Sequence, residues 1–168
     1  MKDHYCLHNK RERKQVFKAL RDDLFYWRES LLLRAWDFTL VEVDERPPQV
    51  NRTIELPLLY ARTYSDPNYK EARIELFVDT EGCTTKGQIE LLTCHEILHV
   101  MLSPVTDAWE TALRQKIDAD QFAFVKPLLY GPEEGVCQDL AFRLVELRRN
   151  QKPARKKKAR PRKAPAGS

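Results

Sequence analysis

Residues 93–104 read Thr-Cys-His-Glu-Ile-Leu-His-Val-Met-Leu-Ser-Pro, and this stretch decides how the rest of the chain is interpreted. His95 and His99 are four residues apart, so on a helix they lie on one face, one turn apart. Two imidazoles in that arrangement can bind a single zinc ion at about 2.0–2.1 Å. Glu96 lies about 100° round the helix and can reach a water on the zinc, whose pKa falls to about 7. The pattern therefore predicts one zinc ion per chain, His95 and His99 as ligands, and Glu96 as general base.

The alternative interpretation is an exposed helix with two solvent-facing histidines. The residues around the pair argue against it, because a helix that is apolar on nearly every face is buried. Unpaired histidine and glutamate side chains would be costly in a buried helix, and a metal site satisfies them. The apolar flanking residues are Leu91, Leu92, Ile97, Leu98, Val100, Met101 and Leu102.

With this motif, residues 70–147 resemble the zincin metallopeptidases: a strand, the His-Glu-x-x-His helix, and a second helix that offers an acidic ligand. The likeness is to the compact gluzincin-like enzymes of bacteria and their phages, such as the ImmA/IrrE type. No His-x-x-Gly-x-x-His continuation follows His99, so the chain departs from the metzincins. The resemblance implies zinc-dependent hydrolysis of peptide bonds in a protein or peptide substrate. It also implies that strand 72–79 is an edge that pairs with substrate; the alternative is an ordinary internal strand.

The third zinc ligand has two candidates, Glu133 and Glu134. The run 134–137, Glu-Gly-Val-Cys, resembles the Glu-Gly-x-Ala run of several gluzincins, which implies that Glu134 is the ligand. Helical phase favours Glu133 instead, because it is in line with Cys137 and other apolar positions. Both carboxylates could also simply stabilise a helix N-terminus. Asp107 and Asp139 are candidates for orienting a ligand histidine from behind.

The hydrophobic pattern predicts an α+β fold in a single domain, residues 1–147. The N-terminal helix has one apolar face formed by Val16, Leu20, Leu24, Trp27 and Leu31. Thr85 and Gln88 form a capping-box signature at the start of the His-Glu-x-x-His helix. Helices are expected at 10–35, 86–102, 106–125 and 131–147, and strands at 36–44, 53–63 and 72–79, the last two forming a hairpin. The final helix should bury Val136, Cys137, Leu140, Leu144 and Leu147.

Composition indicates a cytoplasmic protein. Of the 168 residues, 42% are hydrophobic and 32% are charged, and no run is long enough for a membrane helix. The N-terminus has no apolar signal-peptide segment. The four cysteines are scattered, which is typical of thiols in a reducing compartment, with Cys94 and Cys137 filling the core.

The C-terminal residues 148–168 hold ten Lys or Arg and no Asp or Glu, whereas the other 147 residues carry 19 basic and 25 acidic side chains. This segment is predicted to be a disordered basic tail. Such a polycation would contact nucleic acid without reading sequence, or would only improve solubility. The functional alternative to a peptidase is a non-catalytic zinc protein of the same fold that binds nucleic acid or a protein partner. An intact Glu96 favours the peptidase, because a binding module has no need for a general base.

Overall fold

The computed structural model describes residues 4–43, 59–78 and 83–151, and their fold is α+β, as predicted. The described part contains three helices, a three-stranded sheet and a two-stranded sheet. The elements are β1 (His4–Cys6), α1 (Lys10–Ser30), β2 (Asp37–Val43), β3 (Leu59–Asp66), β4 (Glu71–Val78), β5 (Cys83–Thr85), α2 (Lys86–Arg114) and α3 (Ala119–Gln151).

Helix α1 begins at the cap Asn9, whose side chain accepts the Arg11 N–H. The predicted apolar face is confirmed, since four of its five residues are buried and Leu31 packs at its edge. The helix ends at Ser30 rather than at residue 35. The reason is Leu32, whose φ of 59° is left-handed and incompatible with another helical turn.

The larger sheet has the strand order β2-β4-β3, with β2 parallel and β3 antiparallel to β4. The predicted hairpin is therefore confirmed as β3–β4, although residues 53–58 of its first strand lie outside the described residues. Alternate side chains of β4, Ala72, Ile74 and Leu76, are buried against the helices. The prediction that strand 72–79 is an edge is wrong, because β2 bonds to one side of β4 and β3 to the other.

Helix α2 starts with the predicted capping box: Thr85 accepts the Gln88 N–H, and the Gln88 side chain accepts the Thr85 N–H. The prediction that Ser103-Pro104 ends this helix is wrong, since α2 runs on to Arg114. A proline leaves the carbonyl four residues before it without its usual donor. Here the Ser103 hydroxyl donates to that carbonyl, on Val100, at 2.9 Å, so the helix continues through the proline.

The helix expected at 106–125 is divided between two elements, with 106–114 in α2 and 119–125 in α3, and α3 also takes in the helix expected at 131–147. The chain turns at residues 115–118, where Asp118 accepts the Gln121 N–H and the Gln121 side chain accepts the Asp118 N–H. This second capping box is visible in the sequence as Asp-x-x-Gln and marks the start of α3. Pro127 and Pro132 lie inside the helix rather than at its start.

Helix α3 continues to Gln151, four residues beyond the predicted end of the last helix, and so includes Arg148 and Arg149. Residues 152–168 of the predicted tail lie outside the described residues. The buried stripe of α3 is Cys137, Ala141 and Val145. Of the predicted stripe only Cys137 is buried and Leu144 half-buried, whereas Val136, Leu140 and Leu147 are exposed.

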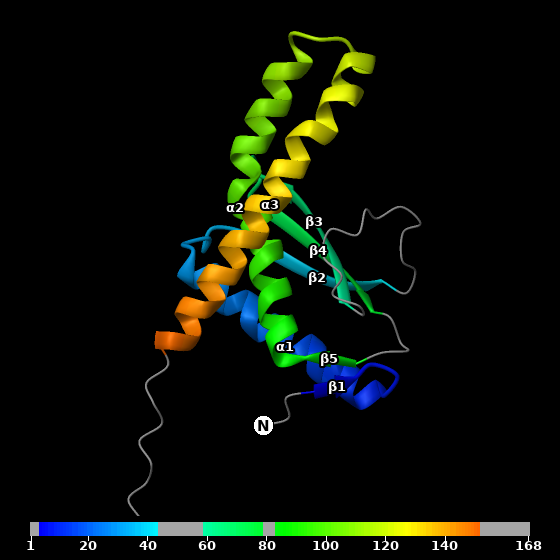
Figure 1. Cartoon of the computed structure of the whole chain (residues 1–168), viewed down its shortest axis with the longest axis vertical. Coiled ribbons are helices and arrows are strands. Elements are labelled where there is room, and N and C mark those ends of the chain that lie inside the picture. Colours follow the sequence, from blue (N-terminus) through cyan, green and yellow to red (C-terminus); the bar gives the residue numbers. More distant parts are fainter. Residues whose placement is uncertain (1–3, 44–58, 79–82, 152–168) are drawn as a thin grey trace, which may run out of the picture.

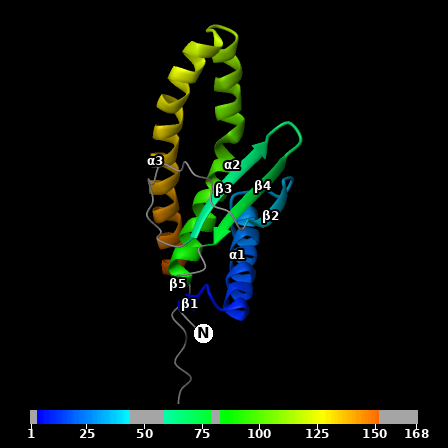
Figure 2. The ribbon, with the colours of Figure 1, turned by 90° about the vertical axis from the view of Figure 1, so that its right-hand side faces the viewer.

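Helix α2 is central: it packs against α1, against β3 and against α3. Figures 1 and 2 show α2 and α3 side by side as a long antiparallel hairpin whose far end projects beyond the sheet. The half of α2 that carries His95 and His99 is enclosed by the other elements, which explains why that stretch is so uniformly apolar. No helix among the described residues is long and apolar enough to cross a membrane.

Candidate metal centre

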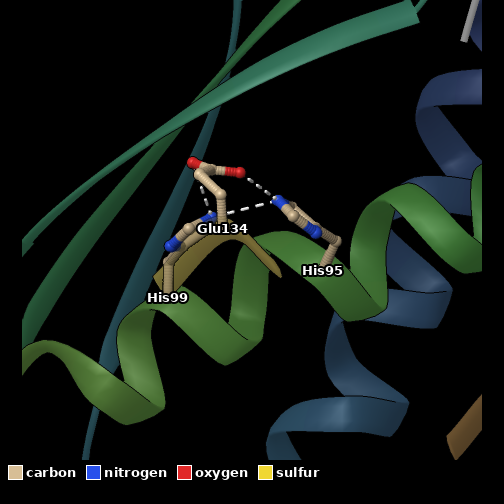
Figure 3. Close-up of side chains that lie close together, drawn as sticks. All are labelled: His95, His99 and Glu134. Carbon is tan, nitrogen blue, oxygen red and sulfur yellow. Dashed lines mark hydrogen bonds and ion pairs between the residues drawn. The ribbon is translucent and has the colours of Figure 1, made fainter. Parts of the chain in front are cut away.

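Three of the side chains singled out in the sequence meet at one point between α2 and α3. His95 Nε2 and His99 Nε2 are 3.0 Å apart. Glu134 of α3 reaches both, with Oε2 at 3.3 Å from His95 Nε2 and Oε1 at 3.4 Å from His99 Nε2. Figure 3 shows both rings and the carboxylate pointing at one another. These three residues could hold a metal ion.

Glu133 occupies a different place from its neighbour. Its Oε1 lies 3.2 Å from Nδ1 of His99, on the far side of the ring from Glu134. The Glu133 side chain is only 11% exposed, compared with 42% for Glu134. The buried Cys137 Sγ is 3.6 Å from the same Nδ1, so His99, Glu133 and Cys137 form a second group that could hold a metal ion.

The two groups share His99 but use opposite nitrogens of its ring. A histidine that binds metal through one nitrogen commonly donates the N–H of the other to a carboxylate, which fixes its tautomer and orientation. Glu133 is placed to accept such a bond. Of the acidic residues considered for this position, Glu133 contacts His99, whereas Asp107 and Asp139 are exposed. The two histidines differ here, because Nδ1 of His95 is buried without a hydrogen-bond partner among the described residues.

Glu96 is buried, and its carboxylate is held by the neighbouring strand. The Thr63 hydroxyl of β3 donates to Glu96 Oε2 at 2.7 Å. Burial raises the pKa of Glu96 above its ordinary value, against the opposing influence of His99, His95 and the Thr63 bond. Thr63 was not singled out in the sequence. The signal that could have suggested it is the two-residue period of a strand, which places Thr63 on the same face of β3 as the buried Ala61.

The charges around the histidines favour a cation. The contact with His95 holds the pKa of Glu134 below its usual range despite partial burial, so this carboxylate is ionised at neutral pH. Burial by itself lowers the pKa of His99, but its contacts with Cys137 and Glu133 outweigh burial and raise the pKa to about 11. Acidic groups on both sides of the ring thus stabilise positive charge at this point.

The predicted residues His95, His99 and Glu134 are therefore brought together, and Glu96 lies on the same helix, oriented by β3. Glu133 contacts the opposite nitrogen, Nδ1, of the His99 ring. Cys137, which was expected only to fill the core, contacts the same nitrogen. No protein-family model, no curated protein and no solved structure matches this chain.

Proposed function

We propose that this chain is a zinc-dependent metallopeptidase, with zinc held by His95, His99 and Glu134 and with Glu96 as general base. The observation that carries the proposal is the convergence of two imidazole nitrogens and one carboxylate, from two helices, at mutual distances of 3.0–3.4 Å.

The spacing of these donor atoms fits zinc. Ligands bound at about 2.0–2.1 Å in a tetrahedral arrangement are about 3.3 Å from one another. The three distances in this cluster lie around that value. Little movement of the side chains would be needed to accept the ion.

The donor set favours zinc over the hard cations. Magnesium and calcium take oxygen ligands, whereas imidazole suits zinc and other transition metals. Two histidines and one glutamate are a ligand set of catalytic zinc, which leaves a fourth position for water or substrate. A site that served only structure would more often have four protein ligands.

Each residue near the cluster has a role in the proposed reaction. A bound zinc ion would supply a Lewis acid and a water of lowered pKa. Glu96 would accept a proton from the attacking water on its carboxylate and pass it to the leaving amine. Thr63, which donates to Oε2 of Glu96, would keep the carboxylate turned toward the site, and Glu133 would hold the ring of His99.

An extended peptide is the substrate that the surroundings favour. Among the described residues, β3 pairs only with β4, so its other side is available for an added strand. β3 also carries Thr63, the partner of Glu96, and Figure 3 shows the sheet passing over the cluster. A peptide paired with β3 would therefore lie across the site. In this proposal the strand that pairs with substrate is β3, and not strand 72–79.

Removing either histidine should abolish stoichiometric zinc binding. We expect about one zinc per chain in the wild type after zinc-replete expression, and close to none in His95→Ala or His99→Ala, because two remaining donors bind weakly. Metal analysis of purified protein measures this directly. His8→Ala is the matched control, since His8 is exposed near the N-terminus and should leave the zinc content unchanged. A wild type without zinc would refute the assignment.

The two neighbouring glutamates should differ in a diagnostic way. Glu133→Ala should weaken zinc binding by roughly 10- to 100-fold, the usual cost of removing a group that orients a ligand. Glu134→Ala removes a direct bond and should cost more. Glu133→Gln should recover much of the lost affinity because an amide oxygen still accepts the Nδ1–H of His99, whereas Glu134→Gln should not. Chelator competition on the four variants decides between them, and the opposite ranking would make Glu133 the ligand.

The alternative of a non-catalytic zinc protein predicts the same metal content without turnover. Basic residues 152–168, which would contact nucleic acid, lie outside the described residues. The buried position of Glu96 and its bond to Thr63 support the peptidase, since a binding module would not require an oriented carboxylate beside the proposed zinc ligands on the same helix. A wild type that holds zinc but cleaves no member of a diverse peptide library would favour the alternative.

A further inference from the structure

The smaller sheet pairs β1, which lies near the N-terminus, with β5, which directly precedes α2. β1 and β5 are antiparallel, and the register pairs Cys6 directly with Cys83. The two cysteines are 77 positions apart in the sequence. Figure 1 shows this pair of strands at the opposite end of the molecule from the tip of the α2–α3 hairpin.

The two sulfur atoms are in contact. Cys83 Sγ lies 2.9 Å from Cys6 Sγ. A disulfide needs a sulfur–sulfur distance of about 2.05 Å, so the atoms have to approach by less than about 1 Å. Directly opposed residues of antiparallel strands have Cα atoms about 4.5–5.5 Å apart, which lies inside the range of about 4.4–6.8 Å that disulfides accept. The backbone is therefore compatible with a bond between them.

The pair is also accessible to a reagent. Cys83 is exposed and Cys6 is half-buried, whereas Cys94 and Cys137 are buried. Burial raises the pKa of Cys94 to about 12, which leaves this thiol almost entirely protonated and unreactive. The four cysteines thus divide into an accessible pair in β1–β5 and two buried thiols in the helical core.

We propose that Cys6 and Cys83 are a redox modification site, oxidised to an intramolecular disulfide by low-molecular-weight disulfides and reduced again by thiols. Nothing in the proposed peptidase reaction requires this pair.

The chemistry is thiol–disulfide exchange in two steps. The Cys83 thiolate attacks one sulfur of oxidised glutathione, forming a mixed disulfide and releasing one glutathione thiolate. The Cys6 thiolate then attacks Cys83 Sγ, which forms the Cys6–Cys83 bond and releases the second glutathione. The two cysteines lose two electrons and two protons in total, and oxidised glutathione becomes two molecules of reduced glutathione.

The disulfide would link the starts of two helices. Cys6 is three residues before the N-cap of α1, and Cys83 is two residues before the N-cap of α2. The Cys6 backbone N–H also donates to Glu12 of α1 at 2.6 Å, which ties β1 to that helix. A bond at this position would close a long loop in the unfolded chain and thereby stabilise the folded state.

The test uses the full chain incubated with oxidised glutathione or with dithiothreitol. Peptide mapping under non-reducing conditions should show a Cys6–Cys83 linkage in the oxidised sample only. The midpoint of thermal unfolding should rise by roughly 10 °C on oxidation, from the entropy of closing a loop of this length. Dithiothreitol should restore both the free thiols and the lower midpoint.

Variants Cys6→Ser and Cys83→Ser are matched, since each keeps the strand and removes one sulfur. Neither should show the rise on oxidation, and Cys6→Ser should stop at the mixed disulfide on Cys83. Cys94 and Cys137 remain in every sample as internal controls and should stay unmodified. The proposal is overturned if oxidised glutathione leaves both wild-type thiols reduced, stops at glutathione on the wild-type Cys83, or links two chains. Formation of the Cys6–Cys83 bond without a higher unfolding midpoint would overturn only the expected stabilisation.

Discussion

Glu96→Gln should lower the rate of peptide hydrolysis by about 10²- to 10⁴-fold, the usual contribution of a general base, while leaving zinc content and fold intact. Glutamine has nearly the same shape, and its amide can still interact with the Thr63 hydroxyl that holds the carboxylate. It cannot accept a proton from the attacking water. The loss should therefore appear in turnover and not in metal binding.

The measurement compares the variant with the wild type on a library of fluorogenic peptides, with zinc analysis of the same preparations. Glu146→Gln is the matched control, because this glutamate is exposed on α3 and pairs only with Arg143 in the described structure. It should retain wild-type activity. Full activity of Glu96→Gln on a peptide that the wild type cleaves would show that another group is the base.

Deleting residues 148–168 should destabilise the protein strongly, whereas deleting residues 152–168 should not. Arg148 donates to Asp23 at 2.7 Å and lies 3.9 Å from Glu90, and both acids are buried. Arg149 also donates to Glu90, at 3.0 Å. The first deletion would leave two buried carboxylates without their guanidinium partners.

Breaking a buried ion pair on one side costs about 3–5 kcal/mol, a large part of the roughly 5–15 kcal/mol that holds a domain together. Arg148 also packs its guanidinium 3.8 Å from the ring centre of Tyr26 and 5.5 Å from that of Trp27, so its loss removes packing as well. We expect Arg148→Ala alone to lower the free energy of unfolding by several kcal/mol. Denaturant unfolding of chains 1–147 and 1–151 gives the comparison.

Arg143→Ala provides the matched control on the same helix. Its side chain is 80% exposed and pairs with the exposed Glu146, so the change should cost less than about 1 kcal/mol. Combining Arg148→Met with Asp23→Asn and Glu90→Gln should recover part of the lost stability, because the buried charges are then gone. Equal unfolding midpoints for chains 1–147 and 1–151 would show that Arg148 and Arg149 contribute little to the free energy of unfolding.

The sequence was sufficient wherever the controlling interaction is local. The spacing of His95 and His99 along one helix, the capping box of Thr85 and Gln88, and the apolar face of α1 all depend on residues within one or two turns of each other. Helical geometry relates such residues directly, so the pattern alone predicts their arrangement.

Helix ends were predicted less well, because a proline does not by itself end a helix. Pro104 is tolerated since the Ser103 hydroxyl bonds the carbonyl that the proline leaves without a donor. The true interruption at residues 115–118 was marked by the Asp118 and Gln121 capping box, which the sequence does contain. The capping box, and not the proline, therefore marks the boundary between the two helices.

Only the tertiary structure decided what lies on the inner face of α3. Sequence periodicity favoured a stripe of Val136, Cys137, Leu140, Leu144 and Leu147, of which only Cys137 is buried and Leu144 half-buried. The buried stripe is instead Cys137, Ala141 and Val145, with Arg148 three residues further along the same face. Several apolar positions on α3 are equally compatible with a helical period, and the partner surface selects among them.

The packing of α3 against α2 also decides the different contacts of Glu133 and Glu134. Adjacent residues on a helix point about 100° apart, so Glu133 and Glu134 cannot make the same contacts. The packing of α3 against α2 places Glu134 at Nε2 of both histidines and Glu133 at Nδ1 of His99. The local sequence therefore determined that a histidine pair would share one face of a buried helix. The packing of α3 against α2 determined which carboxylate completes the cluster, because that depends on a contact between residues more than thirty positions apart.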